Sequence, residues 1–393
     1  MLSRVPRAFK VARRAALDRV TIALLRASRR RVLELTRTDR IGHLMAEIDC
    51  VMKEEHLRKA PVRRPLLLAP RGRVANRHAL RYWRRYVDIV ESPWLCKRLK
   101  RAGRDPSIRF RDDMRPYFTA INETARGYRI LAEWGDRGPL LQLEARDVER
   151  GEARLRKLGI PEGAPFVCFH CRDGGYSPGD EYMHTYRNVS VESYLPAMKA
   201  LRDRGIIGVR MGDPTMPPLS AVDGVVDYAH SPLRSEWMDV FLCASCEFFL
   251  GNSSGLYLVS LAFGKPSALA NLAPMSTSLG AAPGDLAIPK LLWHEKEERL
   301  LTFREILGSP IGNYRYAEEY RAAGIRALEN DPEDVTALAL EMLARLRGEA
   351  VYDEADRVRQ ERFRSLFEPS HYAHGSAGHA GRDFLRRHEP LLV

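Results

Sequence analysis

The sequence lacks several features that would assign it to a common class of protein. No uninterrupted apolar run approaches the roughly 18 residues that a membrane-spanning helix needs, and no secretory signal core precedes a small-residue cleavage site. The motifs G-x-x-x-x-G-K-S/T and G-x-G-x-x-G are absent, so an ATPase and an NAD-dependent dehydrogenase lose their usual support. We therefore expect a cytoplasmic protein of another class.

Cysteine is scarce, with six residues in 393. Four of them form two C-x-x-C pairs, Cys168 with Cys171 and Cys243 with Cys246, which is the spacing of a zinc site. The first pair lies in the β-type run FVCFHC, where residues three apart point to opposite faces, and the second lies in the apolar stretch VFLCASC. We therefore predict reduced core cysteines, no metal site and no cofactor.

Positive charge is in excess, with 63 Lys and Arg against 51 Asp and Glu, a formal net charge of +12. An anionic partner such as a nucleotide, a membrane surface or a nucleic acid is therefore expected. Ten of the basic residues and one acidic residue fall within residues 1–31. The apolar residues between them have the spacing of one helix face: Val5, Phe9, Val11, Leu17, Val20, Ile22, Leu24 and Leu25. We interpret 1–31 as a basic amphipathic leader that attaches to the inner face of the cytoplasmic membrane, with a solvated leader as the alternative.

Strand-like and helix-like segments alternate through most of the chain, which is the pattern of a parallel sheet covered by helices. The predicted strands of the second half are 166–170, 206–211, 248–251 and 267–271, and the predicted helices there include 191–204, 236–244 and 254–263. A length of 393 residues suits two domains. We predict an α/β fold of two Rossmann-like domains, 32–158 and 159–330. A C-terminal helix and tail, 331–393, could pack back on the N-terminal domain.

The sharpest local signal is Gly251-Asn252-Ser253-Ser254-Gly255, which closes a predicted strand and opens a predicted helix. Backbone N–H groups at such a turn, with the positive end of the helix behind them, bind anions readily. The two serine hydroxyls add donors, and Gly255 lets a phosphate approach the backbone. The alternative is an ordinary helix N-cap with serine at its start.

The segment GNSSGLYLVSLAFGKPSALAN, which begins at Gly251, resembles the donor-site segment of two-domain (GT-B) glycosyltransferases, especially the heptosyltransferase-like group. A wider set of motifs resembles a family of bacterial glycosyltransferases found around surface-polysaccharide biosynthesis. These motifs are Arg40-Ile41-Gly42-His43-Leu44, Arg172-Asp173-Gly174-Gly175-Tyr176, Arg187-Asn188, Arg210-Met211-Gly212 and Phe384-Leu385. The resemblance implies two domains that face each other across a cleft, with the acceptor bound by 32–158 and a nucleotide-sugar donor by 159–330.

Phe169-His170-Cys171-Arg172-Asp173 also resembles the His-x-Arg-x-Asp strand end of fucosyltransferases that use a GDP-sugar, in which the arginine contacts the donor's diphosphate. Here a single Arg-Asp pair replaces the usual Arg-Arg-x-Asp, so fucose is only one possible donor sugar. The sequence also lacks the Asp-x-Asp triplet that holds a divalent ion in the other main glycosyltransferase architecture. We therefore predict a metal-independent enzyme in which cations and N–H donors stabilise the leaving diphosphate.

Candidate site residues follow from these motifs. The predicted donor-binding residues are Arg172, Arg210, Asn252, Ser253, Ser254 and Gly255. Arginine suits this role because its planar fork meets two phosphate oxygens at once, although a surface salt bridge is the alternative for either arginine. The predicted catalytic residues are His43, as general base on the acceptor hydroxyl, and Asp173, with Asp39 as a further rival. Gly42, Tyr176 and Asn188 are predicted to contact the sugar or the acceptor.

The prediction for function is a hexosyl- or deoxyhexosyltransferase that moves a sugar from a nucleotide-sugar donor to a glycan or lipid-linked acceptor, in bacterial surface-polysaccharide biosynthesis. A nucleotide-sugar epimerase of the same fold, which would need no acceptor, is the enzymatic alternative. A non-catalytic basic module that binds nucleic acid or anionic glycan is the other. The positive charge is concentrated in the leader and no nucleic-acid motif is present, so no nucleic acid partner is expected.

Overall fold

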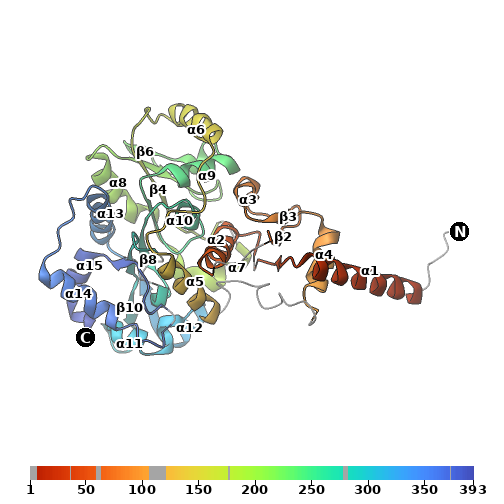
Figure 1. Cartoon of the computed structure of the whole chain (residues 1–393). Helices are drawn as coiled ribbons and strands as arrows, with labels where there is room; N and C mark the ends of the chain where they lie inside the picture. The colour runs from red at the N-terminus through yellow and green to blue at the C-terminus, as the bar shows by residue number, and fades with distance from the viewer. Residues whose placement is uncertain are drawn as a thin grey trace. The chain divides into compact units, whose positions relative to one another are not determined.

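The computed structural model describes residues 7–35, 37–58, 63–105, 121–175, 178–277, 282–371 and 373–393 (Figure 1). The chain divides into two compact units, Met1–Gly127 and Tyr128–Val393. The helix α5 (Ile121–Trp134) crosses this division, and α6 (Ala145–Lys157) belongs to the second unit. The sequence placed the boundary at 158, after α6, because Gly159 and Pro161 end that helix, whereas the structure places it about one helix earlier.

The first unit contains a three-stranded parallel sheet in the order β1-β2-β3. Its strands are β1 (Val32–Leu33), β2 (Leu66–Leu68) and β3 (Asp88–Val90). Its helices, besides α5, are α1 (Arg7–Ser28), α2 (Ile41–Leu57), α3 (Arg77–Trp83) and α4 (Pro93–Ala102). Side chains start two of them: Asn76 Oδ1 accepts from Ala79 N–H at 2.8 Å, and Ser92 caps α4 directly before Pro93. An α/β arrangement was predicted here, and it is confirmed.

Helix α1 packs on α4 through only part of the apolar face that the sequence predicted. Leu25 is buried at 3% exposure in a cluster that includes Leu99, and Ile22 packs against the same cluster. Leu24, on the neighbouring side of the helix, stays 66% exposed. Some apolar residues of α1 therefore pack against α4, and others are exposed to solvent. Among the described residues, no helix combines the length and apolarity that a membrane crossing requires.

The second unit is built on a seven-stranded sheet whose order is β13-β9-β8-β7-β4-β5-β6, with every pair parallel. The strands are β4 (Phe166–His170), β5 (Ile207–Arg210), β6 (Val225–Val226), β7 (Phe249–Gly251), β8 (Ser267–Leu272), β9 (Leu286–Pro289) and β13 (His379–Ala380). From β4 the chain adds β5 and β6 on one side, then returns to add β7, β8 and β9 on the other. This is the doubly wound order, and it creates a topological switch point between β4 and β7.

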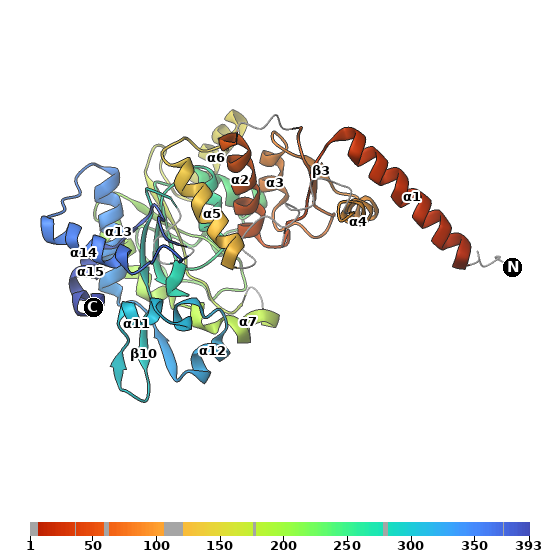
Figure 2. The same cartoon turned by 60° about the horizontal axis from the view of Figure 1, so that its bottom comes forward.

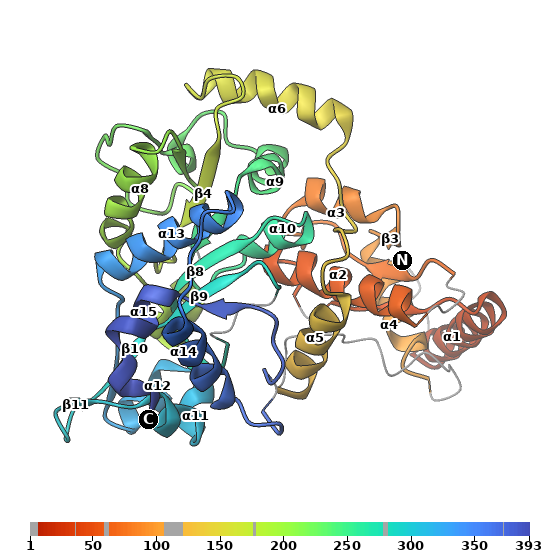
Figure 3. The same ribbon diagram turned by 60° about the vertical axis from the view of Figure 1, so that its left-hand side comes forward.

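Two groups of helices cover this sheet. Helices α8 (Leu195–Arg202), α13 (Pro332–Leu346) and α15 (Arg382–Arg387) form one group, and α6, α9 (Glu236–Ser245) and α10 (Tyr257–Ala262) form the other. Figures 1 and 3 show the sheet between the two groups. All residues of β7, β8 and β9 are buried. A parallel sheet covered on both faces requires such continuous apolar strands, which is why the sequence predicted several of them correctly.

A small antiparallel sheet follows β9 after the single residue Lys290. Its order is β11-β10-β12, with β10 (Leu291–His294), β11 (Arg299–Leu300) and β12 (Ile325–Leu328). Helices α11 (Phe303–Leu307) and α12 (Ala317–Ala322) lie in the same part of the chain, as Figure 2 shows. The sequence did not predict this sheet, since strands of two to four residues carry little periodicity.

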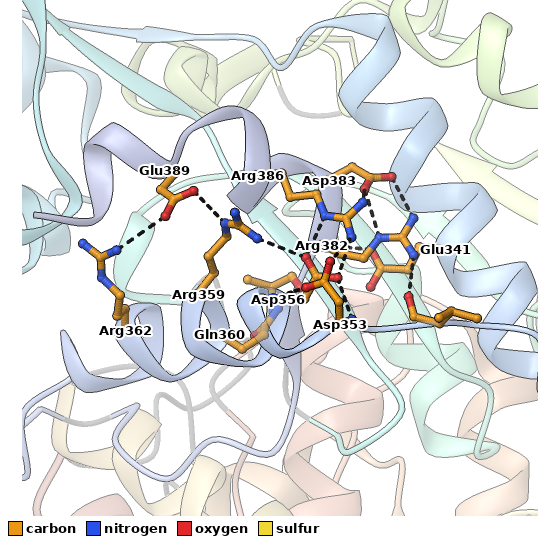
Figure 4. A network of polar contacts seen from close by, with 12 residues as sticks. Glu341, Asp353, Asp356, Arg359, Gln360, Arg362, Arg382, Asp383, Arg386 and Glu389 are labelled. Atoms are coloured by element: carbon orange, nitrogen blue, oxygen red, sulfur yellow. Dashed lines mark hydrogen bonds and ion pairs between the residues drawn. The ribbon is translucent and has the colours of Figure 1, made fainter.

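The C-terminal segment joins the second unit through backbone pairing. Strand β13 extends the seven-stranded sheet beside β9, with His379 opposite Leu286. A packing of 331–393 back on the N-terminal domain stays a prediction. Between α13 and β13 lies α14 (Glu354–Ser365), and a polar network joins α14 to α15 (Figure 4). Its centre is Asp356, 3% exposed, which accepts two hydrogen bonds of 2.6 Å from the Arg386 guanidinium.

Candidate functional site

The two motifs that the sequence singled out lie together at the switch point of the seven-stranded sheet. Strand β4 ends at His170, which pairs with Gly251 at the end of β7. Residues 171–173 follow the first strand and residues 252–255 follow the second. Open α/β sheets bind their ligands outside the carboxyl ends of the strands at this point, because the two flanking connections diverge there and leave a crevice. The strand order therefore identifies the candidate site independently of any motif.

Hydrogen bonds join the loops around this point into one structure. The backbone N–H of Arg172 donates to Asn252 Oδ1 at 3.1 Å, and Asn252 is fully buried. The Asn252 amide in turn donates to the Arg187 carbonyl at 2.9 Å. The Arg187 guanidinium donates to the Ser253 carbonyl. A single asparagine thus fixes the loop after β4, the segment near residue 187 and the loop after β7.

The Arg172 side chain belongs to a closed polar triad. Its guanidinium donates to Asn188 Oδ1 and, at 3.0 Å, to Glu181 Oε2, and the Asn188 amide donates to Glu181 Oε1. Glu181 lies in α7 (Pro178–His184). Each member satisfies the other two, so the guanidinium is held in one orientation. The structure brings the predicted residues Arg172 and Asn188 into contact, and it adds Glu181, which no motif indicated.

Two polar atoms at this edge are buried without a partner in the described part of the chain. Asp173 Oδ1 accepts from Gly175 N–H at 3.0 Å, but its Oδ2 has no hydrogen bond, and neither does Ser254 Oγ. Buried polar atoms are nearly always bonded to protein, water or ligand. Both residues were predicted for the site, and both have unused hydrogen-bonding capacity there.

The loop after β7 differs from the prediction in one respect. Helix α10 begins at Tyr257 rather than at Ser254 and has six residues. The reason is a tight turn in which Ser254 N–H donates to the Asn252 carbonyl at 2.6 Å, so that residues 252–256 are not helical. The backbone N–H groups of this segment therefore belong to a loop, not to a helix terminus, and that of Ser254 is used within the turn.

Arg210, at the end of β5, is 1% exposed. Its guanidinium donates to the Pro217 carbonyl at 2.7 Å and lies 3.4 Å from Asp227 Oδ2. Its Nε is buried and unbonded among the described residues. The contacts with Pro217 and Asp227 hold the loop between β5 and β6.

His170 is a strand-end residue that sequence reasoning did not place in the site. Burial lowers the pKa of its imidazole, and its Nδ1 lies 3.0 Å from the Met211 carbonyl. A carbonyl can only accept, so Nδ1 carries the proton and Nε2 is left as an acceptor. The motif Phe169-His170-Cys171-Arg172-Asp173 contained this histidine, but only the strand pairing places it at the switch point.

The other predicted residues lie in the first unit or outside the described residues. Gly42 and His43 occupy the first turn of α2, where His43 Nδ1 lies 2.6 Å from Oε1 of the fully buried Glu47. Asp39 forms an ion pair of 2.8 Å with Arg37. The hydrogen bond from Arg37 lowers the pKa of Asp39, which makes it a weaker base. Tyr176 lies outside the described residues.

Within the described ranges, no three or more His, Cys, Asp or Glu side chains are grouped so that they could hold a metal ion. The two C-x-x-C pairs consist of buried free cysteines. Cys168 lies beside Cys243 and Cys246, and burial raises its pKa well above the ordinary value. Neutral buried thiols of this kind act as small apolar residues.

Comparisons with known proteins give similarities only among solved structures. No family model matches the chain, and no curated protein matches it. A glycosyl transferase family 9 protein of Veillonella parvula is 11% identical over 61% of this chain and 80% of its own, with a TM-score of 0.39. The ADP-heptose lipopolysaccharide heptosyltransferase II of E. coli is 14% identical over 61% and 84%, with a TM-score of 0.34. An E. coli heptosyltransferase solved with ADP is 12% identical over 66% and 91%, with a TM-score of 0.36.

Proposed function

We propose that the chain is a glycosyltransferase that binds a nucleotide-sugar donor at the carboxyl edge of the seven-stranded sheet and passes the sugar to a glycan or lipid-linked acceptor. One observation carries the proposal. The two donor-type motifs, Arg172-Asp173 and Asn252-Ser253, meet at the switch point through the 3.1 Å bond from Arg172 N–H to Asn252 Oδ1. The resemblance of these motifs to GT-B donor segments supplies the substrate class.

The chemistry needs stabilisation of the nucleoside diphosphate that leaves. The Arg172 guanidinium is oriented by Asn188 and Glu181, its backbone N–H donates to Asn252, and the Arg187 guanidinium donates to the Ser253 carbonyl. Guanidinium groups and loop N–H donors can stabilise the growing negative charge without a metal ion. We extend the proposal to a metal-independent reaction in which Arg172, Asn252, Ser253, Ser254 and Gly255 surround the diphosphate. Arg210 contributes indirectly, through the loop that it supports.

The acceptor needs a base for its hydroxyl proton. His43 is the candidate in the first unit, because Glu47 can accept from its Nδ1 and leave Nε2 free of a proton. Asp173 is the candidate in the second unit, through its unbonded Oδ2. In either case the acceptor oxygen attacks the sugar carbon, the bond from that carbon to the phosphate oxygen breaks, and the hydroxyl proton passes to the base.

We also propose that the enzyme works at an anionic membrane surface, as surface-glycan assembly on the inner face of the cytoplasmic membrane would require. Leu17, Val20 and Leu24 lie at helical spacing on α1 and are 37%, 56% and 66% exposed. Trp94 of α4 is 64% exposed and stacks on Arg98, which in turn donates to Thr21 of α1. An exposed apolar stripe and a tryptophan among many basic residues suit the headgroup region of an anionic bilayer.

Thermal shift against UDP-, GDP-, ADP-, dTDP- and CMP-sugars, with and without EDTA, tests the donor site. We expect one nucleotide class to stabilise the protein in both conditions, by about 2.7 kcal/mol at 100 times its dissociation constant. Arg172→Ala should remove the shift. Arg321→Ala, at an exposed arginine in the same unit, should leave it unchanged. If no nucleotide sugar shifts the wild-type protein, the proposed donor site is wrong.

Product analysis separates the remaining alternatives. Sugar transferred to an added glycan or lipid acceptor, with release of the nucleoside diphosphate, is the result expected of a transferase. A changed nucleotide sugar without an acceptor would identify an epimerase instead. Tight, salt-dependent binding of nucleic acid with no nucleotide-sugar binding would favour the basic binding module.

A further inference from the structure

Lys290 is a buried lysine beside the Arg172 triad. It is the single residue between β9 and β10, and it is 3% exposed. Its ammonium donates to the backbone carbonyl of Asn188 at 2.8 Å. The side chain of the same Asn188 meets Arg172 and Glu181. Lys290 therefore holds the backbone of Asn188, and the side chain of Asn188 orients Arg172, the candidate phosphate-binding residue.

A second charged residue holds the same segment. Glu329 follows β12, and its two carboxylate oxygens lie 3.3 and 3.2 Å from the backbone N–H of Ser190. Between these two contacts, Val189 N–H donates to the Arg172 carbonyl at 3.1 Å. Residues 188–190 are thus bonded to a lysine, to a glutamate and to the backbone of Arg172. Lys290 directly precedes β10 and Glu329 directly follows β12, so the small antiparallel sheet positions both of them beside residues 188–190.

We propose that Lys290 and Glu329 are positioning residues, which hold residues 188–190 so that Asn188 and Glu181 present the Arg172 guanidinium to the diphosphate of the donor. The proposal rests on the proposed function and adds the small sheet to the donor site. Neither residue touches the donor. Their action passes through Asn188 and the backbone of Arg172.

The burial of Lys290 agrees with a positioning role. Removing an ammonium from water is unfavourable, and an apolar residue would fill the same space without that penalty. Burial lowers the pKa of Lys290 to about 8, and the charge of Glu329 opposes the shift. A buried charge is weak evidence of a gain in stability, and groups with shifted pKa values cluster at functional sites. The hydrogen bond to the Asn188 carbonyl is stronger from an ammonium than from a neutral amine.

Because Lys290 titrates near pH 8, its positioning role should make the affinity for the nucleotide depend on pH in this range, which a purely structural role would not. Lys290 is charged below its pKa and neutral above it, so its hold on Asn188 weakens as pH rises through about 8. Terminal phosphates have a pKa of about 6 and are almost fully ionised at pH 8, so the phosphates add no transition there. Glu329 is the charged group that acts on the amine, and Arg172 and Glu181 face the other side of Asn188.

The affinity for UDP, GDP or ADP, whichever the thermal-shift panel identifies, is measured by calorimetry from pH 7 to about 9.5. Wild-type protein should lose affinity through about pH 8. Lys290→Met should bind at least about fivefold more weakly at pH 7, as expected for the loss of one charged hydrogen bond, and should show no further loss near pH 8. Lys199→Met, at an exposed lysine of α8, should behave as wild type. Wild-type affinity and an unchanged pH profile in Lys290→Met would overturn the proposal.

Glu329→Gln gives a second variant with a different signature. Its amide oxygen still accepts from Ser190 N–H, but the negative charge that raises the pKa of Lys290 is gone. We expect the alkaline loss of affinity to move to lower pH while the fold is kept. An alkaline loss at the wild-type pH would contradict the assigned role of Glu329.

Hydrogen exchange of the ligand-free protein separates this proposal from the proposed function. Lys290→Met should increase exchange at the amides of Val189 and Ser190, relative to Lys199→Met, whether or not a nucleotide binds. Increased exchange in a protein that binds no nucleotide would keep the positioning contact and reject the donor site. Unchanged exchange at both amides would reject the positioning contact itself.

Discussion

At the scale of single residues, Asp239 shows how the fold can oppose the charge of a side chain. Burial raises the pKa of this α9 carboxyl to about 6, from an ordinary value of 3.8. The hydroxyl of Tyr228 donates to it at 2.7 Å, which offsets part of the burial. Because the folded carboxyl keeps its proton at a higher pH than the unfolded one, this group lowers stability above about pH 6. The lost stability returns as pH falls toward 4.

Asp239→Asn should therefore raise the free energy of unfolding at pH 7, by about 1–3 kcal/mol. The amide keeps an oxygen that can accept from Tyr228 but carries no charge. Urea unfolding at pH 7 and near pH 4 measures the difference, which should shrink at the lower pH. Asp223→Asn, at a side chain 90% exposed, should change little at either pH. A variant less stable than wild type at pH 7 would mean that the Tyr228 contact needs the carboxylate.

Some site residues could be predicted from sequence because they follow recognisable strands. Arg172 and Asn252 come directly after apolar runs, and parallel strands end at one edge of their sheet. Arg210 follows the same rule but is covered by the loop that continues from it, which no local pattern reveals. Lys290 could not be predicted, since it meets Asn188 across 102 positions of the chain.

At the scale of elements, the network around Asp356 fastens α14 to α15. Burial alone would raise the pKa of this carboxyl. Hydrogen bonds from the Arg386 guanidinium and the Asp353 backbone lower it by more than burial raises it, so the pKa lies below the ordinary value of 3.8. The carboxylate therefore stabilises the fold above its unfolded pKa, and this contribution is lost as pH falls through the lowered value. Figure 4 shows these contacts between α14 and α15, the helix that directly follows β13.

Asp356→Asn should lower the free energy of unfolding by about 1–2 kcal/mol at pH 7, a value reduced for the partial exposure of Arg386. It should also increase hydrogen exchange across residues 379–393. Glu354→Gln, in an exposed pair on the same helix, is the matched control and should do neither. If both variants behave alike, the network is not what holds the C-terminal segment.

The proposed membrane surface is formed by two helices, the apolar stripe of α1 and Trp94 of α4. Val20→Asp with Leu24→Asp should abolish co-sedimentation with vesicles that contain about a third phosphatidylglycerol, because anionic headgroups repel the new carboxylates and the apolar surface that enters the acyl boundary is lost. The donor-induced thermal shift should remain. Val351→Asp with Val358→Asp places the same charges on exposed valines of the second unit and should leave binding intact. Equal vesicle binding by both double variants would exclude the α1 stripe.

Elements with strong periodicity were predictable, and short ones were not. The strand 166–170 and the helix from 236 were predicted nearly to the residue, because they are continuous apolar or amphipathic runs. The start of α10 was wrong by three residues, since a turn at residues 252–256 competes with the helix. The strands β10, β11 and β12 exist through their mutual pairing, which sequence periodicity does not contain.

At the scale of the whole molecule, the alternation of strands and helices predicted the fold class but not the strand order. The switch point exists because β4 pairs with β5 on one side and β7 on the other. Strand β13, from the far end of the chain, completes the sheet beside β9. The boundary predicted at 158 rests on Gly159 and Pro161 after a helix, whereas the two compact units of the structure divide after Gly127. A facing arrangement of the two units stays a prediction.

The central claim is that a nucleoside diphosphate binds at the switch point, and hydrogen exchange with the identified nucleotide tests it most directly. We expect reduced exchange in residues 170–175, 185–190 and 251–256, with the reduction absent in Arg172→Ala. The third segment is distant in sequence from the other two, since Asn252 bonds Arg172 across 80 positions and Arg187 across 65. Protection confined to other segments, with these three unchanged, would contradict the account.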